Sequence, residues 1–161
     1  MVFSFQKTEH FITKCDETSP PLLTAIHKRV FSHHWGEETF NNFLFDKQVF
    51  GFISFLVGKP QKANGFILCR LIGDEAEIIT FGVDPNYRQR GIGQGLLDAT
   101  LRHLHHERAH QIFLEVDEKN TAAINLYRQF NFENVGRRPA YYETPEGRSD
   151  AIIMRRLLRQ T

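Results

Sequence analysis

The feature that most constrains the fold is a polar, glycine-rich turn between an apolar run and an amphipathic one. Residues 83–97 read Val-Asp-Pro-Asn-Tyr-Arg-Gln-Arg-Gly-Ile-Gly-Gln-Gly-Leu-Leu. The run before this turn (75–83) has the pattern of a strand, and the leucines after it recur at helical spacing. The start of a helix carries unpaired N–H groups and the positive end of the helix dipole, which together favour phosphate. Glycines let the backbone approach an anion closely, and Arg88 and Arg90 add positive charge. The turn therefore predicts a phosphate or diphosphate site.

Two common nucleotide-binding patterns do not fit this turn. A Walker A loop requires a lysine after its last glycine, and none follows here. A dinucleotide-binding fingerprint requires a third glycine where this chain has Leu96. A glycine-rich turn that serves only tight helix packing remains a second interpretation.

The rest of the hydrophobic pattern predicts a mixed α/β domain. Helical spacing marks the segments 20–30, 37–44, 91–108 and 121–130. Strand-like runs cover 50–57, 66–72, 75–83, 111–116 and 148–157, with a further short strand near 132–135. Residues 59–65 and 73–74 have the composition of turns. We therefore expect an antiparallel meander first, followed by strands that alternate with helices.

Length and composition limit the chain to one globular domain. Its 161 residues and 18.8 kDa suit one hydrophobic core, so we expect a single domain over residues 1–161. Basic residues number 20 and acidic residues 19, and this near-balance argues against direct binding of nucleic acid or an anionic membrane. The longest apolar stretch, 49–58, is about half of the ~20 residues that a membrane helix needs. Two cysteines without metal-ligand spacing suit a reducing cytoplasm, and no metal is expected.

Two side chains downstream of the turn are candidates for acid–base chemistry. Glu115 interrupts a run of apolar strand residues, and burial there would raise the pKa of its carboxyl towards that of a general base. Tyr127 lies four residues after Ala123 and three before Phe130, on the inward face of the predicted helix. A solvent-facing glutamate and a packed core tyrosine are equally acceptable interpretations of these residues taken singly.

The pattern R-x-x-G-x-G after V-D-P, leading into a helix, resembles the acyl-CoA loop of the GNAT superfamily of N-acetyltransferases. The resemblance implies that main-chain N–H groups of the loop hold the diphosphate of coenzyme A. It carries over to Arg88, Gln89, Arg90, Gly91, Ile92, Gly93, Gln94 and Gly95. The strand end at Phe81, Gly82 and Val83 would pair with the pantetheine arm, and a bulge would separate it from the next strand. The implied fold is a central, mostly antiparallel twisted sheet flanked by helices.

A second segment narrows the resemblance. The pattern L-E-V-x-x-x-N-x-x-A-I-x-L-Y-x-x-x-x-F from residue 114, with R-R-P-A-Y-Y at 137–142 and S-D-A-I-I-M at 149–154, is similar to the RimI branch of GNATs. Members of that branch are bacterial ribosomal-protein-alanine N-acetyltransferases. The resemblance implies that Glu115 is the general base and Tyr127 the general acid. It also implies that Asn120 contacts the coenzyme.

Basic and aromatic residues precede the last predicted strand. They are Arg137, Arg138, Tyr141 and Tyr142, which we place on a loop. They would line the acceptor side of the site, with the aromatic rings walling an extended peptide N-terminus. A solvated basic turn without a ligand is an equally open interpretation.

The function implied by the resemblance is direct transfer of acetyl from acetyl-CoA to a primary amine. The expected acceptor is the N-terminal α-amine of a protein or peptide, and a ribosomal protein is the acceptor that the resemblance implies. A GNAT that acts on a small-molecule amine and a non-catalytic acyl-CoA-binding module are the alternatives. We expect a cytoplasmic monomer or homodimer that contacts neither nucleic acid nor membrane.

Overall fold

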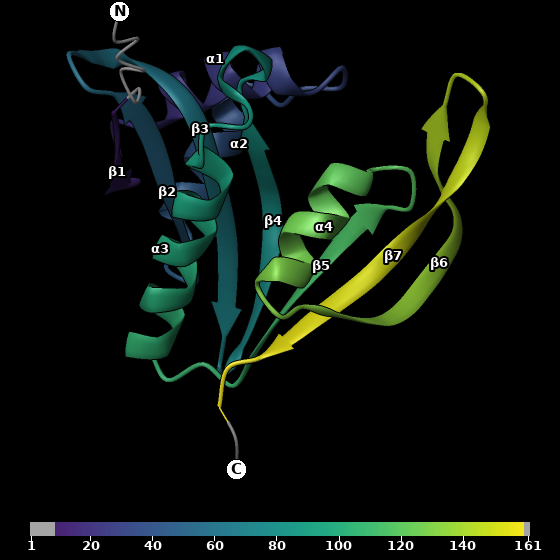
Figure 1. Cartoon of the computed structure of the whole chain (residues 1–161). Coiled ribbons are helices and arrows are strands. Elements are labelled where there is room, and N and C mark those ends of the chain that lie inside the picture. Colours follow the sequence, from purple (N-terminus) through teal and green to yellow (C-terminus); the bar gives the residue numbers. More distant parts are fainter. Residues whose placement is uncertain (1–8, 160–161) are drawn as a thin grey trace, which may run out of the picture. The chain divides into compact units, whose positions relative to one another are not determined.

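The structure of the protein is a computed structural model that describes residues 9–159 (Figure 1). Within that range it has the strands β1 (His10–Lys14), β2 (Val49–Leu56), β3 (Lys59–Ile72), β4 (Glu75–Val83), β5 (Gln111–Asp117), β6 (Glu133–Thr144) and β7 (Gly147–Leu157). The α-helices are α1 (Pro20–Val30), α2 (Glu37–Phe45), α3 (Ile92–His106) and α4 (Thr121–Gln129), and a 3-10 turn, η1, covers Pro85–Tyr87. None of the helices in residues 9–159 is both long enough and apolar enough to span a membrane.

The strands form one sheet in the order β1-β2-β3-β4-β5-β7-β6. The pairs β1–β2, β5–β7 and β6–β7 are antiparallel, and β4–β5 is parallel. This arrangement confirms the predicted mixed α/β class and the mostly antiparallel sheet. The parallel register joins only three residue pairs, from Glu75↔Gln111 to Glu77↔Phe113. The bulge and the strand separation that the family resemblance implies at the end of β4 stay predictions.

The chain divides into two compact units, each built from two stretches of sequence. The first unit comprises residues 1–68 and 80–101, and the second comprises 69–79 and 102–161. The chain passes from one unit to the other within β3, β4 and α3. Neither unit is therefore a continuous piece of sequence.

In the first unit, glycines let helices approach both faces of the sheet. A Cβ at Gly82 would lie 2.7 Å from Cγ1 of Val30 in α1. A Cβ at Gly65, in β3, would lie 2.7 Å from Ile92 and 2.9 Å from Leu96, both in α3. Even the single Cβ atom of an alanine would crowd these neighbours. The absence of a side chain at Gly82 and Gly65 therefore lets α1 and α3 pack closely on opposite faces of the sheet.

An aromatic cluster fills the space beneath α1. The His27 ring lies 4.5 Å from Phe31 and 4.8 Å from Trp35, measured between ring centroids. Phe40, from α2, and Phe66, from β3, contact the same histidine. The Nδ1 atom of His27 also accepts a hydrogen bond from the backbone N–H of Trp35 at 3.1 Å. This histidine thus joins the two helices and the segment between them.

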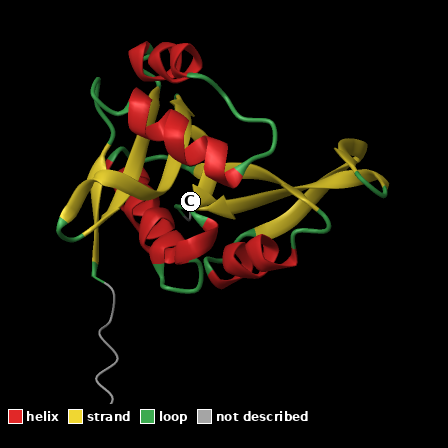
Figure 2. Ribbon diagram, turned by 90° about the horizontal axis from the view of Figure 1, so that it is seen from above, coloured by secondary structure: helices red, strands yellow, loops and turns green. Residues whose placement is uncertain are grey.

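In the second unit, β7 lies between β5 and β6, and the β6–β7 pair is a long hairpin that twists along its length (Figures 1 and 2). Its register shifts between Arg138 and Tyr142, where three residues oppose Asp150 alone. Helix α4 is tied to β7, because Nη1 of Arg156 donates to the carbonyl of Phe130 at 2.9 Å.

Three parts of the sequence prediction are wrong. Strand β1 was not predicted, since it is a short edge strand with no apolar run. Strand β3 begins at Lys59 rather than Phe66, because the turn lies at Gly58 (φ 86°) and a proline is tolerated at the start of a strand. The predicted loop at 137–142 belongs to β6, whose mostly exposed residues lack the alternation that marks a strand.

Candidate active site

The glycine-rich turn has the backbone that an anion site requires. It runs from η1 through Arg88, Gln89 and Arg90, which are exposed, to the first residue of α3 at Ile92. Gln89 (φ 61°) and Gly91 (φ 81°) both adopt the left-handed conformation. The first N–H groups of α3 have no partner within the helix. These features are the ones that a diphosphate site requires, and the binding of a diphosphate by the amides that follow Gly91 stays a prediction.

The base of the turn is fixed by an ion pair between a buried carboxylate and a partly exposed arginine, which the sequence did not reveal. Asp84 is only 1% exposed, and its carboxylate accepts from Nε of Arg29 in α1 at 2.8 Å. The same guanidinium donates to the carbonyl of Ala63 at 2.8 Å. Asp84 also accepts from the N–H of Asn86, and its own N–H donates to the carbonyl of Asn64. The aspartate of the V-D-P pattern was the available signal, but its partner lies 55 residues away.

Two of the predicted coenzyme residues also have packing roles. A Cβ at Gly95 would lie 2.8 Å from Cδ1 of Ile12 in β1, and the Gly95 N–H already donates to the carbonyl of Gly91. Gly82 faces Val30. Close packing is thus one reason for glycine at positions 82 and 95, and at Gly95 it agrees with the second interpretation of the turn. It does not account for Gly91, since a Cβ there would have nothing within 4 Å.

Glu115 lies in the second unit, in the middle of β5. Its neighbours Leu114 and Val116 are buried, whereas the Glu115 side chain is 29% exposed. The carboxylate oxygen Oε1 lies 2.9 Å from Nε of Arg138 in β6. The carboxylate is therefore only partly buried, in contrast to the prediction, and it forms an ion pair with Arg138.

Tyr127 lies on the inward face of α4, as predicted, and is 6% exposed. Its ring centroid is 5.6 Å from that of Phe132. Burial raises the pKa of the phenol well above its usual range, and the nearby Cys69 and Tyr142 raise it further. The hydroxyl therefore carries its proton throughout the neutral range, as a proton donor must.

Asn120 begins α4. Its side-chain oxygen accepts from the N–H of Ala123 at 3.2 Å, which satisfies one of the unpaired donors at the helix start. The prediction that Asn120 or Thr121 caps this helix is therefore confirmed for Asn120. Its predicted contact with the coenzyme stays a prediction.

The four residues predicted to line the acceptor side differ in their surroundings. Arg137 is held by two carboxylates, with Nη1 2.7 Å from Glu118 and 2.6 Å from Asp150. These hydrogen bonds raise the pKa of its guanidinium. Asp150 also accepts from the N–H of Ala140, which has φ 51°. Arg137 therefore supports the irregular stretch of β6.

The other three residues lie at the irregular stretch of β6, where its register with β7 shifts: they are Arg138, which also contacts Glu115, and Tyr141 and Tyr142. The guanidinium carbon of Arg138 is 5.6 Å from the ring centroid of Tyr141, which is 51% exposed. Burial raises the pKa of Tyr142 to about 12, and the charge of Glu115 adds to the shift. The second unit therefore brings together a carboxylate, an arginine and two tyrosine rings.

The sequence matches the acetyltransferase (GNAT) family over residues 15–132, more than half of the chain. The chain belongs to the GNAT family of acetyltransferases. It is 32% identical to the [ribosomal protein bS18]-alanine N-acetyltransferase of Escherichia coli K12 over 143 residues, which cover 89% of this chain and 94% of that one. It is 44% identical to the N-alpha-acetyltransferase RimI of Mycobacterium tuberculosis over 82 residues, 51% of this chain and 49% of that one.

Solved structures of this GNAT fold superpose well on the chain. The crystal structure of the ribosomal-protein-S18-alanine N-acetyltransferase from Escherichia coli gives a TM-score of 0.87 at 29% identity, covering 95% of this chain and 96% of that one. Arabidopsis thaliana NAA60 in complex with a bisubstrate analogue gives 0.81 at 19% identity, covering 92% and 98%, and shows the shared fold.

These comparisons confirm the predicted family, the fold class and the class of enzyme, an N-acetyltransferase. A crystal structure of Arabidopsis thaliana NAA60, which shares this fold, is in complex with acetyl-CoA, the co-substrate that the sequence analysis expects for this chain. Within residues 9–159 the structure contains no group of three or more histidine, cysteine or acidic side chains arranged to hold a metal ion. The roles of the individual site residues remain predictions.

Proposed function

We propose that this GNAT enzyme transfers acetyl from acetyl-CoA to the N-terminal α-amine of a protein, with an alanine N-terminus as the preferred acceptor. The observation that carries the proposal is the 32% identity, over nearly the whole of both chains, to an enzyme named for alanine N-acetylation of a ribosomal protein. The chemistry of the α-amine supports the same acceptor. Its reference pKa of about 7.7–8.0 makes it far easier to deprotonate than lysine, at about 10.4.

Binding of the coenzyme would fall to the first unit. The amides that follow Gly91 would hold the diphosphate, and the end of β4 at Phe81, Gly82 and Val83 would pair with the pantetheine arm. The Val83 N–H would then polarise the thioester carbonyl and stabilise the charge that develops on its oxygen. The Arg29–Asp84 ion pair would keep the turn in position during binding.

Proton removal from the acceptor would fall to Glu115. A carboxylate that already binds one cation, the Arg138 guanidinium, can bind an ammonium group in its place. The carboxylate would take the proton from the acceptor, directly or through water, and leave the amine free to attack. Tyr127 would give its proton to the departing thiolate of the coenzyme. No covalent intermediate on the enzyme is needed.

The cysteines fit a reaction without an enzyme thiolate. Within residues 9–159, Cys15 and Cys69 are both free thiols. Burial raises the pKa of Cys15 to about 12, so it is not a thiolate near neutral pH. Free thiols also suit a reducing compartment, and we place the enzyme in the cytoplasm.

The test is release of coenzyme A from acetyl-CoA in the presence of a panel of acceptors. The panel holds peptides that differ only in their first residue, the same peptides with a blocked N-terminus, and small amines such as spermidine. We expect the free Ala-starting peptide to give the highest kcat/KM and its blocked form to give none. Glu115→Gln should lower that kcat/KM by about 100-fold or more, whereas the exposed Glu77→Gln should not.

Two results would contradict the proposal. Faster turnover with a small amine than with any peptide would make this a small-molecule acetyltransferase. Binding of acetyl-CoA without release of coenzyme A for any acceptor would make it an acyl-CoA-binding module.

A further inference from the structure

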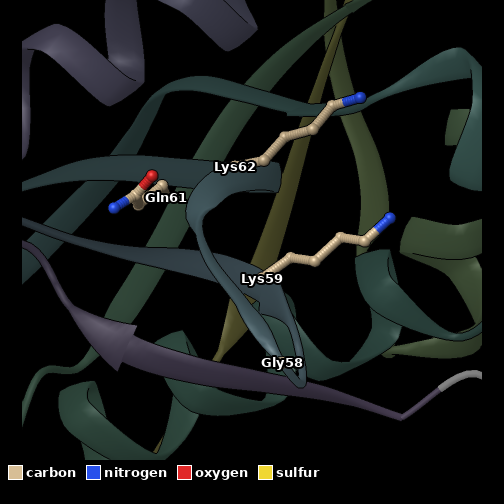
Figure 3. A pocket seen from close by; sticks show the side chains of 4 residues that line it. All are labelled: Gly58, Lys59, Gln61 and Lys62. Carbon is tan, nitrogen blue, oxygen red and sulfur yellow. The ribbon is translucent and has the colours of Figure 1, made fainter.

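A hollow with a basic lining lies at the turn between β2 and β3. It has a volume of about 460 Å³ and is lined by Gly58, Lys59, Gln61 and Lys62. The two lysine side chains extend the same way from β3, and Gln61 points away from them (Figure 3). Within residues 9–159 neither lysine forms an ion pair, so both charges are available to a ligand.

The hollow adjoins the diphosphate turn of the same unit. Nζ of Lys62 lies 6.0 Å from the ring centroid of Tyr87, and the guanidinium carbon of Arg90 lies 5.1 Å from that centroid. Tyr87 belongs to η1, just before the turn. Its ring therefore lies near one cation from β3, Lys62, and one from the turn, Arg90. The hydrogen bond from the Asp84 N–H to the Asn64 carbonyl, at 2.8 Å, holds β3 and η1 together beside them.

Basic residues outnumber acidic ones among the residues of the hollow and the turn. Lys59, Lys62, Arg88 and Arg90 are all exposed. Asp84 is the acidic residue nearest in sequence to the turn, and its carboxylate is buried and paired with Arg29. On a chain whose net charge is only +1, such a cluster forms a local site for an anion.

We infer that Lys59 and Lys62 bind a phosphate monoester, and that in the working enzyme it is the 3′-phosphate on the ribose of coenzyme A. This inference rests on the proposed binding of acetyl-CoA at the turn before α3. Coenzyme A carries a diphosphate and, one ribose away, a monoester of charge about −1.5 to −2 near neutral pH. The amides of α3 suit the diphosphate, and two exposed lysines that extend the same way suit the monoester, whose charge is concentrated on one phosphate group.

The experiment measures by calorimetry the Kd of coenzyme A and of dephospho-coenzyme A, which lacks only the 3′-phosphate. Wild-type protein should bind coenzyme A about 10-fold more tightly. The double variant Lys59→Gln/Lys62→Gln should bind both at the weaker affinity, because it has lost the group that distinguishes them. Lys47→Gln, which removes an exposed lysine of the same unit outside the hollow, should keep the 10-fold difference.

The possible failures are distinguishable. Equal binding of the two coenzymes by wild-type protein, or an undiminished difference in the double variant, would overturn this inference and leave the diphosphate site intact. Binding of neither coenzyme by folded wild-type protein would overturn the coenzyme assignment and this inference together. Circular dichroism checks that the double variant is folded, which we expect because both lysines are exposed.

Discussion

Several side chains at the predicted site have partners that lie far away in the sequence. The helical spacing of Tyr127 and the apolar surroundings of Glu115 could both be read locally. The Arg138 partner of Glu115 and the Arg29 partner of Asp84 could not, because both pairs form only when separate elements come together. For the same reason the sequence could not show that the two neighbouring arginines differ. Arg137 pairs with Glu118 and Asp150, whereas Arg138 pairs with Glu115.

Tyr127→Phe tests the proton donor at the residue scale. The ring would stay in its packing site against Phe132, and only the hydroxyl would be lost. We expect kcat to fall by about 100-fold or more, with the Kd for coenzyme A unchanged. Because burial raises the pKa of this phenol, wild-type activity should not decline through tyrosine ionisation between pH 7 and 9. A variant as active as wild type would remove Tyr127 from the reaction.

Whole elements could be predicted where their pattern is local and strong. The helices α1, α2, α3 and α4 lie close to the predicted segments because each has an apolar face at helical spacing. Strand β6 was underestimated, since most of its residues are exposed and carry no periodic signal. The start of β3 was misplaced because the stretch after Gly58 has the composition of a turn although it pairs as a strand.

His27 of α1 packs against Phe40 of α2, and we expect this contact to make the stability of the two helices depend on pH. Burial lowers the pKa of this imidazole to about 4, and nearby His34 adds to the shift, whereas the unfolded value is about 6.5. Between those values the unfolded chain binds a proton that the folded chain does not. The free energy of unfolding should therefore be highest above pH 6.5 and fall by about 2–3 kcal/mol as the pH drops to 4.

Urea unfolding at pH 7 and pH 4.5 measures this dependence. Since acidic groups also contribute to acid destabilisation, the comparison is with His27→Gln, which lacks the imidazole. The variant should be less stable at pH 7 and should lose less stability on acidification than wild type. Equal losses in the two proteins would show that the His27 proton does not govern the coupling of α1 and α2.

At the scale of the whole molecule, the chain has two compact units, whereas the sequence predicts a single domain over residues 1–161. That single domain stays a prediction. Because the chain crosses between the units within β3, β4 and α3, unfolding of either unit would break elements that run into the other. We therefore predict one cooperative transition.

The single tryptophan makes this measurable. Trp35 lies in the first unit, so its fluorescence reports that unit, while far-ultraviolet circular dichroism reports both. The two signals should follow one urea curve with one midpoint. A fluorescence midpoint separated from that of the dichroism would show that the units unfold independently and that the chain has two domains.

The central claim is that the amides before and at the start of α3 hold the diphosphate of coenzyme A. The most direct test is calorimetric titration of coenzyme A into wild-type protein, Gly91→Val and Gly73→Val. Both glycines are in the left-handed region and open to solvent, so the two substitutions impose similar backbone strain, and only Gly91 adjoins α3. The account predicts wild-type binding that Gly91→Val weakens at least 10-fold and Gly73→Val leaves unchanged. Equal affinity in all three proteins, or no binding of coenzyme A by wild type, would contradict it.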